Sequence, residues 1–295
     1  MKITLLGTGT PKPLPNRASS GYLIEVGDDL IVMDQGAGSG QRLIESGAKQ
    51  SEVSHAFFSH LHHDHCLDYP RLVLQRWDLG ADKIPELKVF GPPPIGRMTE
   101  LLFGPEGVFW PDIVGRTEHP ASNEIFRVRG GTPPRPKPRP EVTEIQAGDV
   151  IEGKGWKVTV AEVPHLQPIM PCYAFRLEGD GASMCYSGDS GGVPESLVEL
   201  ARGVDVLIHM TYIMSGTEPH PLFRELTGSH LDVAEVAQRA GARTLVLTHM
   251  LEQIDQPGIR ERVVSDIMNV FEGTVIWGED LMEIPVEPLA PAKIE

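Results

Sequence analysis

One stretch of thirteen residues constrains this chain more than any other part of its sequence. It spans residues 57–69, reads FFSHLHHDHCLDY, and contains four histidines and two aspartates. It continues the apolar run VSHAFF, which is typical of a buried β-strand. A single histidine in a folded domain usually needs one partner, so a cluster this dense at the end of a strand indicates a shared ligand. A metal ion is the ligand that suits nitrogen and oxygen donors together.

The spacing within the cluster points its donors in two directions. Side chains two residues apart face the same way in an extended segment, so His60, His62 and Asp64 can converge where the strand ends. His65 approaches from another direction, which leaves donors for two adjacent ions. Imidazole suits zinc, and a neighbouring carboxylate suits a slightly harder second ion. We therefore expect two zinc ions (Zn²⁺), with manganese or iron as less favoured occupants.

Three further donors stand at the ends of other predicted strands. His165 closes TVAEVPH, Asp189 lies in CYSGDS, and His249 closes TLVLTH. Loops at the edge of a sheet are where functional sites are built. Any one of these residues alone would more often be structural, but together with the cluster they complete a ligand set for two metals.

Composition and charge limit the class of protein. The 295 residues are 40% hydrophobic, enough for one large domain or two fused halves, and no linker separates the halves, so we expect a single domain over 1–295. With 26 basic and 41 acidic residues the net charge is −15, which disfavours nucleic acid as a partner but allows a local basic groove.

Cysteine use and hydropathy predict a cytoplasmic protein. Cys66, Cys172 and Cys185 form no CxxC pair and no disulfide framework, which favours a reducing compartment. The first residues, MKITLLGTGTP, lack a cleavage-site pattern, and no apolar run reaches the roughly 18 residues of a membrane helix. We therefore expect no membrane association.

Strand-like and helix-like segments alternate along the chain. Apolar runs such as KITLLG and GYLIEV predict early strands, and helices are expected within 37–49, 68–80 and 95–104. Ser229 is the expected N-cap of a late helix and Gly241 its stop. The alternation predicts an α/β (α+β) fold, in which two sheets are flanked by helices.

Between residues 104 and 140 the regular spacing of apolar residues that indicates helices and strands becomes weak. This region ends in GGTPPRPKPRP at 130–140, whose five prolines and three basic residues favour an extended polyproline segment. We expect a surface loop there, and a substrate lid, a pocket wall and a subunit contact are the alternatives.

Taken in order, the HxHxDH motif at 60–65 and the three later donors resemble the metallo-β-lactamase superfamily. Two longer stretches, SGDSGGVPESLVELARGVDVLIH and SHLDVAEVAQRAGARTLVLTH, resemble its ribonuclease Z and arylsulfatase-like branch. The resemblance covers most of the chain and implies a four-layer αββα sandwich with a dinuclear metal site in the groove between the sheets.

Ligand roles follow from the resemblance residue by residue. It implies that one zinc is held by His60, His62 and His165, and that the other is held by Asp64, His65 and His249. It also implies that Asp189 bridges the two ions. A hydroxide between two zinc ions has a pKa near 7, so it is a nucleophile at neutral pH, and Asp64 would help to position it.

Two residues outside the ligand set have roles implied by the resemblance. His230 in GSHLDVAE would stabilise the scissile group or protonate the leaving oxygen, and capping or surface exposure is the alternative. Asp34 in VMDQGAG would orient a metal-bound histidine, and an ordinary turn residue is the alternative. Structural or exposed roles are expected for the remaining histidines considered, which are His55, His63, His119 and His220.

The chain departs from the ribonuclease Z pattern in two places. Met210 in IHMTY stands where the family carries a glutamate that partners the catalytic histidine. Only 23 residues separate His165 from Asp189, which leaves no room for the family's tRNA-gripping arm. Some apolar residues could line a substrate pocket or simply pack in the core: Met170, Met210, Met214, Tyr212 and Phe223.

These departures and the acidic charge favour a small substrate. We expect a dinuclear zinc hydrolase that cleaves an ester-type bond, namely a sulfate ester, phosphodiester, lactone or carboxylic ester, in a small molecule. The alternatives are a ribonuclease Z-type tRNA 3′-processing endonuclease and a non-catalytic metal-binding or scaffold protein on the same fold. An iron-based redox role is disfavoured because flavodiiron-type relatives carry a glutamate at the position of His62. A homodimer is a further possibility for the oligomeric state.

Overall fold

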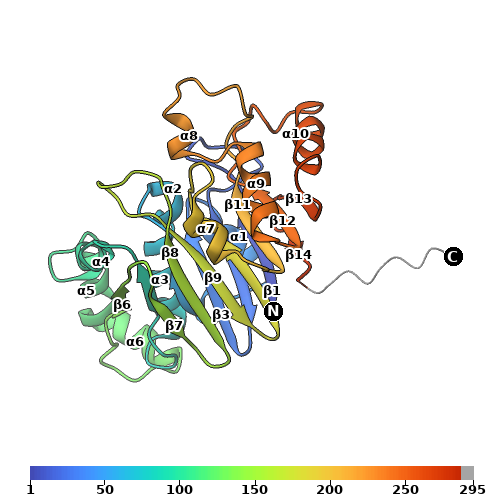
Figure 1. Ribbon diagram of the computed structural model, residues 1–295. Helices are drawn as coiled ribbons and strands as arrows, with labels where there is room; N and C mark the ends of the chain where they lie inside the picture. The colour runs from blue at the N-terminus through green and yellow to red at the C-terminus, as the bar shows by residue number, and fades with distance from the viewer. Residues whose placement is uncertain (287–295) are drawn as a thin grey trace.

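The computed structural model describes residues 1–286, which form two seven-stranded sheets packed face to face (Figure 1). In spatial order the first sheet contains β14 (Glu283–Ile284), β1 (Lys2–Gly7), β2 (Gly21–Val26), β3 (Asp29–Gln35), β4 (Val53–Phe57), β5 (Lys88–Gly91) and β6 (Glu141–Glu144). The second contains β13 (Thr274–Trp277), β12 (Thr244–Thr248), β11 (Val206–Met210), β10 (Ala182–Tyr186), β9 (Tyr173–Gly179), β8 (Trp156–Glu162) and β7 (Val150–Glu152).

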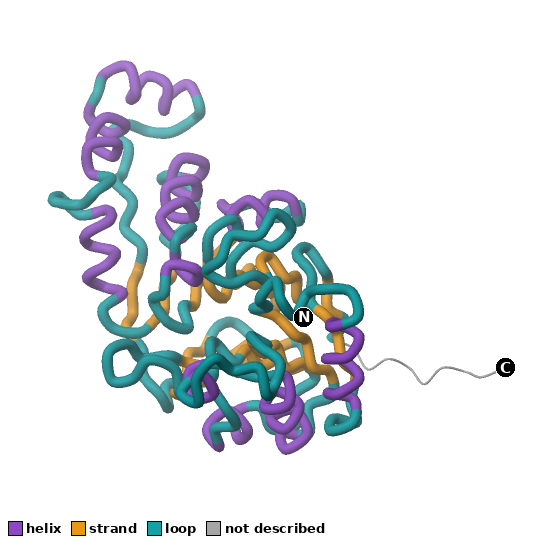
Figure 2. Tube along the Cα trace, turned by 90° about the horizontal axis from the view of Figure 1, so that it is seen from above, coloured by secondary structure: helices purple, strands orange, loops and turns teal. Residues whose placement is uncertain are grey.

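Helices cover the outer face of each sheet, as the view in Figure 2 shows. Those that follow strands of the first sheet are α1 (Ser39–Glu45), a 3₁₀ turn at Gln50–Glu52, α2 (His63–Cys66), α3 (Tyr69–Gly80), α4 (Ile95–Phe103), α5 (Trp110–Glu118) and α6 (Pro120–Val128). Those that follow strands of the second are α7 (Glu195–Leu200), α8 (Phe223–Leu226), α9 (His230–Ala240) and α10 (Ile259–Met268). The layers are therefore α, β, β, α, as expected.

Both sheets are mixed in the same way. β1, β2 and β3 pair antiparallel, whereas β3 to β6 pair parallel. Likewise β7 to β10 pair antiparallel, and β10 to β13 pair parallel. The carboxyl ends of parallel strands meet at one edge of a sheet, so the loops after β10 and β12 gather at one edge of the second sheet. The packing of the two sheets brings the loop after β4 of the first sheet to the same place.

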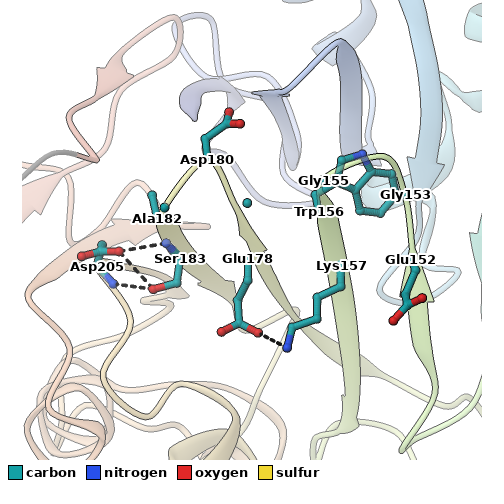
Figure 3. A pocket seen from close by; sticks show the side chains of 12 residues that line it. Glu152, Gly153, Gly155, Trp156, Lys157, Glu178, Asp180, Ala182, Ser183 and Asp205 are labelled. Atoms are coloured by element: carbon teal, nitrogen blue, oxygen red, sulfur yellow. Dashed lines mark hydrogen bonds and ion pairs between the residues drawn. The ribbon is translucent and has the colours of Figure 1, made fainter.

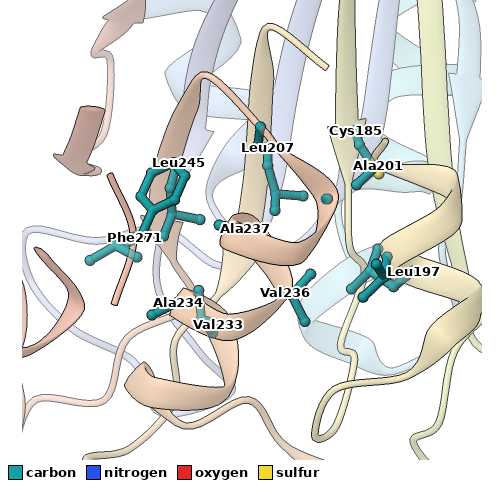
Figure 4. Close-up of a cluster of buried hydrophobic side chains, with 14 of the residues drawn as sticks. Cys185, Leu197, Ala201, Leu207, Val233, Ala234, Val236, Ala237, Leu245 and Phe271 are labelled. Atoms are coloured by element: carbon teal, nitrogen blue, oxygen red, sulfur yellow. The ribbon is translucent and has the colours of Figure 1, made fainter. Parts of the chain in front are cut away.

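Three buried apolar layers hold the sandwich together. The middle layer lies between the sheets and includes Phe57 of β4 and Phe175 of β9, whose ring centroids are 5.7 Å apart. In the outer layer over the second sheet, Leu207 and Leu245 pack against Val233 of α9 (Figure 4). Burying one such side chain contributes about 1.5–3 kcal/mol, so the apolar alternation along the strands determines which face each sheet turns inward.

The sequence-based helix boundaries hold where a capping residue marks them. Ser229 is the N-cap of α9, and its side chain accepts a hydrogen bond from the backbone N–H of Asp232. Gly241 ends the same helix in the left-handed conformation, with φ of 65°. Both expectations are confirmed, because these positions depend on local backbone chemistry.

The structure differs from expectation between residues 104 and 140. The chain forms α5 and α6 there, each with a proline in its first turn, Pro111 and Pro120. Proline suits the first turn of a helix, because its missing N–H would be unpaired there anyway. The stretch 130–140 that follows has no helix or strand, but Trp77 of α3 donates from its indole N–H to the Pro136 carbonyl at 2.7 Å. It therefore packs against α3.

No helix within residues 1–286 is long and apolar enough to cross a membrane.

Candidate metal centre

The histidine cluster begins as an extended segment and ends as a helical turn. β4 ends at Phe57, His62 is extended with φ of −63° and ψ of 147°, and α2 begins at His63. The expectation that Asp64 lies on the extended face with His60 and His62 is therefore wrong. Asp64 and His65 are both in the short helix α2, which sends them to a different point from the two extended histidines.

The first group of donors gathers around His62. Its Nδ1 lies 3.0 Å from His60 Nε2 and 3.3 Å from His165 Nε2. Asp189 Oδ2 lies 3.8 Å from His60 Nε2 and 3.9 Å from His165 Nε2. These four residues offer one ligand atom each within 4.8 Å of one another.

The second group of donors gathers around His249. Its Nε2 lies 3.2 Å from Asp64 Oδ2 and 3.3 Å from His65 Nε2. Asp189 reaches this group too, because its carboxylate oxygens lie 3.4 Å from His65 Nε2 and 3.4 Å from His249 Nε2. The structure thus brings all seven sequence-predicted ligands together, and Asp189 lies between the two groups.

Both groups fit a divalent metal ion. A tetrahedral ion with ligands at about 2.0–2.1 Å separates those ligands by roughly 3.4 Å, close to the spacing of the donors here. Three buried atoms among the ligands have no hydrogen-bond partner within residues 1–286: Asp64 Oδ1, Asp189 Oδ1 and His249 Nδ1. Complete burial lowers the pKa of His60 well below its ordinary value, so its imidazole stays neutral and keeps a lone pair for a metal.

Asp34 orients His65 in the way that the sequence predicts. The Asp34 carboxylate is fully buried, and its Oδ2 accepts hydrogen bonds from His65 Nδ1 at 2.8 Å and from Tyr186 OH at 2.7 Å. Ser59 donates to Asp34 from both its backbone N–H and its hydroxyl. With Nδ1 held in this way, His65 directs Nε2 toward the metal group. The contributions of Ser59 and Tyr186 were not predicted, although Ser59 directly precedes the motif.

His165 is oriented by the main chain of a distant loop. Its Nδ1 donates to the Leu226 carbonyl at 2.7 Å, which directs Nε2 toward His62. Leu226 is the last residue of α8, so the loop between β11 and α9 helps to shape the site. The same loop places Tyr212 beside His249, with ring centroids 5.7 Å apart, and Phe223 beside Tyr212 at 6.3 Å.

His230 lies outside both ligand groups. Its Nδ1 accepts a hydrogen bond from the Ser215 backbone N–H at 2.9 Å, and its Nε2 lies 3.4 Å from Asp266 of α10. The side chain is buried in the first turn of α9. These contacts are those of a histidine that ties the 213–215 segment and α10 to α9, and its catalytic role stays a prediction.

The other residues singled out in the sequence separate into core and surface. His55 is buried against Trp156, with ring centroids 4.9 Å apart in an edge-on contact. Met210 is buried and Met214 packs against the outer core, so both are packing residues. The remaining histidines considered are exposed: His63, His119 and His220.

His209 is a buried histidine for which no role was predicted. It precedes Met210 at the end of β11, and its Nδ1 donates to the Met210 carbonyl at 2.9 Å. Its Nε2 is buried without a partner in the described part of the chain, and burial lowers the pKa of His209 to about 4. In the sequence, the position of His209 within the apolar strand VLIHM could have indicated that this histidine is buried.

Two facing mixed sheets, outer helices and a cluster of histidine and aspartate donors at the strand ends define a metal-dependent hydrolase fold. Residues 31–250 match the family described as "Beta-lactamase superfamily domain". The chain belongs to this superfamily, as its motifs predicted.

Several relatives carry the name ribonuclease Z. The protein of Mycobacterium bovis (strain BCG / Pasteur 1173P2) is 34% identical over 297 residues, covering 98% of this chain and 99% of that protein. The protein of Mycobacterium marinum is 32% identical over 294 residues, covering 97% of this chain and 99% of that protein. The chain is therefore a homologue of ribonuclease Z over essentially its whole length.

Solved structures share the fold at lower identity. A metallo-beta-lactamase fold protein from Bacillus subtilis superposes with a TM-score of 0.73 at 20% identity, covering 96% of this chain and 98% of that chain. The short form of human tRNase Z superposes with a TM-score of 0.69 at 20% identity, covering 98% of this chain and 100% of that chain.

Proposed function

We propose that this chain is a two-zinc phosphodiesterase that acts at the 3′ ends of RNA. The observation that carries this proposal is the position of Asp189, within 3.4–3.9 Å of donors from both ligand groups, which suits a bridge between two ions. Two zinc ions in these groups would supply Lewis acidity and an activated water at neutral pH.

The chain's own residues prepare the site for that chemistry. Burial keeps His60 neutral, so it binds as a lone-pair donor without first losing a proton. The Asp34 carboxylate holds His65 in one tautomer, and the Leu226 carbonyl does the same for His165. Tyr212 and Phe223 supply an aromatic wall next to His249.

Relatives favour RNA over the small substrate that composition and loop length favoured. That preference rested partly on the short connection between His165 and Asp189. The relatives named ribonuclease Z align end to end with this chain, so they have no room for a long extra arm either. The short connection therefore does not separate this chain from them.

A small phosphodiester is the second candidate, and Met210 favours it. Its side chain is buried and cannot carry a proton, whereas the resemblance places a glutamate there. A substrate with a good leaving group needs no proton donor. Bound metal ions would therefore suffice to hydrolyse an activated aryl phosphodiester, without a general acid.

One experiment separates these functions. Zinc-loaded protein and its Asp64→Ala variant are tested on a precursor tRNA with a 3′ trailer and on bis(p-nitrophenyl) phosphate. We expect both substrates to be cleaved by the native chain and neither by the variant. Cleavage of the aryl phosphodiester alone would favour the small-substrate function. Failure on both substrates with two ions bound would favour the non-catalytic metal-binding alternative.

A further inference from the structure

A basic pocket lies at the end of α3 that points away from the metal loop. It has a volume of about 380 Å³ and is enclosed by α3, α5, α6 and the proline-rich stretch 130–140, where α5 and α6 lie beside β6 in Figure 1. Its charged lining residues are four cations and one anion: Lys83, Arg116, Arg129, Arg135 and Asp78. This excess of positive charge stands out in a chain whose net charge is −15.

Asp78 is shared among three guanidinium groups. Its Oδ1 lies 3.0 Å from Arg116 Nη1 and 2.9 Å from Arg135 Nη2, and its Oδ2 lies 3.6 Å from Arg129 Nη1. Lys83 donates to the Arg129 carbonyl, which carries no net charge. One carboxylate therefore lines the pocket together with four cations and contacts three of them, so a second anion in the pocket would relieve their mutual repulsion.

Asp112 adds one further negative charge at the rim. It lies one helical turn before Arg116 on α5 and accepts two hydrogen bonds from that guanidinium at 3.0 Å. Arg116 is thus neutralised by two carboxylates, whereas within residues 1–286 Arg129 has one carboxylate contact, at 3.6 Å. Arg129 and Lys83, whose ammonium donates to the Arg129 carbonyl, are therefore the lining cations that carboxylates neutralise least.

Arg135 forms the rigid floor of the pocket. Its side chain is only 6% exposed, and its Cζ lies 4.0 Å from the centroid of the Trp77 ring. Its Nε is buried, and no atom of the described residues accepts a hydrogen bond from it. A buried guanidinium held in one orientation, with an unused donor, is suited to the oxygens of a phosphate. The stretch 130–140 is therefore a pocket wall, one of the alternatives left open by the sequence.

A larger cavity elsewhere in the described chain provides a contrast. It has a volume of about 660 Å³ and lies where β8 begins, β9 ends and β10 begins (Figure 3). The candidate ligands His165 and Asp189 follow the opposite ends of β8 and β10. The cavity's lining is acidic, and its cation Lys157 is paired with Glu178 at 3.0 Å. The charged lining of that cavity is mostly acidic, like the chain as a whole, whereas the charged lining of the pocket around Asp78 is mostly basic.

We propose that the basic pocket binds a phosphate group and that this group belongs to the backbone of an RNA substrate. The assignment to RNA rests on the function proposed above. Along α3 the chain rises about 14 Å from Tyr69, next to the metal loop, to Asp78. Stacked nucleotides advance about 3.4 Å each, so a ligand reaching both sites is a polynucleotide of several residues rather than a mononucleotide.

Direct titration with inorganic phosphate tests the pocket itself. The side-chain Nε–Hε resonance of Arg135, assigned by loss of that signal in Arg135→Lys, is followed by NMR in the zinc-loaded chain. We expect a saturable shift that weakens at least tenfold in Arg116→Gln/Arg129→Gln. The matched control is Arg127→Gln/Arg202→Gln, which removes two exposed arginines that do not line the pocket. Equal phosphate binding in both double variants, or none in the native chain, overturns the proposal and leaves an ion-pair network around Asp78.

A second measurement tests where the phosphate comes from. Binding of precursor tRNA is measured against salt in an Asp64→Ala background, which blocks cleavage in every variant. We expect the pocket variant to bind RNA more weakly, with the slope of log affinity against log salt reduced by about 0.7–0.9 for each phosphate that the variant no longer binds. Phosphate binding without this effect on RNA overturns the assignment to RNA.

Hydrolysis of bis(p-nitrophenyl) phosphate separates this inference from the proposed function. The pocket variant should hydrolyse it at the native rate, since that substrate is too short to reach both sites. If the native, metal-loaded chain cleaves neither this substrate nor precursor tRNA, the proposed function fails, while the phosphate titration still decides whether the pocket binds an anion.

Discussion

At the scale of single residues, the candidate metal centre depends on side chains that lie outside both ligand groups. Asp34 is the clearest case, because four hydrogen bonds end on its carboxylate and one of them orients His65. Its backbone has φ of 56°, in the left-handed region that side chains seldom adopt. This strained backbone holds a fully buried carboxylate against His65, a candidate metal ligand.

Replacing Asp34 should weaken metal binding. In Asp34→Ala the Nδ1 of His65 and the hydroxyl of Tyr186 lose their acceptor, and we expect zinc affinity to fall by about 10–100-fold. Competition with a chromophoric chelator measures this. Tyr186→Phe is the control, since it removes one donor to Asp34 but leaves His65 in place, and its effect should be much smaller. An Asp34→Ala chain with native zinc affinity would show that the hydrogen bond is dispensable.

His230 gives a prediction that distinguishes a structural from a catalytic histidine. Because its two ring nitrogens contact Ser215 and Asp266, we expect His230→Ala to lower the free energy of unfolding by about 1–3 kcal/mol, and a purely structural role predicts a change in turnover of less than tenfold. Asp266→Ala should weaken the fold in the same direction. A 10²–10⁴-fold loss of turnover in His230→Ala at native stability would instead establish a general acid.

His209 predicts a pH dependence of stability. Its folded pKa is about 4 and its unfolded pKa is about 6.5, so between these values the unfolded chain binds more protons. Stability is full above pH 6.5 and falls toward pH 4, by about 3 kcal/mol for this group. Denaturant unfolding of the native chain and of His209→Gln is measured across this pH range. The difference in stability between the two chains cancels the contribution of the candidate metal ligands, which both chains share. Parallel pH curves would contradict the prediction.

At the scale of helices and strands, backbone conformation decides where elements end. Gly241 stops α9 with φ of 65°, whereas Gly115 lies inside α5 with ordinary helical backbone. At both positions an added Cβ would meet no atom within 4 Å. A comparison of the two positions therefore measures the effect of backbone conformation without a difference in packing.

Alanine at these two glycines should change stability in opposite directions. Gly241→Ala forces a side chain into the left-handed region and should cost about 1–2 kcal/mol. Gly115→Ala removes the extra backbone entropy of an unfolded glycine and should stabilise by about 0.5–1 kcal/mol. Denaturant midpoints measure both, and a shift of the same sign in the two variants would show that packing decides instead.

At the scale of the whole molecule, a metal ion bound at the candidate centre would couple the two sheets. The ligands come from loops after β4, β8, β10 and β12, so a metal ion in either group joins strands of both sheets. An ion that binds the folded chain but not the unfolded chain stabilises it by mass action.

Zinc should therefore raise the unfolding temperature as well as restore activity. We expect close to two ions per chain by elemental analysis, and a chelated chain that unfolds at lower temperature than the reloaded one. Asp189→Ala is the sharpest variant, because Asp189 contacts both groups and its loss should reduce the content below two. A single ion after full zinc reconstitution of the native chain would contradict the dinuclear site.

The sequence by itself determined the candidate ligands and the layers. The motif at 60–65 is local, and each later donor lies within three residues of the end of an apolar strand, so chain direction brings these later donors to one edge of the second sheet. It also determined the ends of α9, where Ser229 and Gly241 act on their own backbone. The sequence did not predict α5 and α6. Each of them has a proline in its first turn, and a proline in a sequence usually indicates that a helix is interrupted.

Only the tertiary structure decided what surrounds those ligands. Asp34, Ser59 and Tyr186 meet across two sheets, and no sequence spacing connects them. His230 was placed correctly at the start of a helix, yet its partners on α10 and in the 213–215 segment were invisible. The cations around Asp78 are spread over positions 83–135 and meet only when helices pack. Local chemistry can be read from the order of residues, whereas the electrostatic environment of a group depends on every element that folds against it.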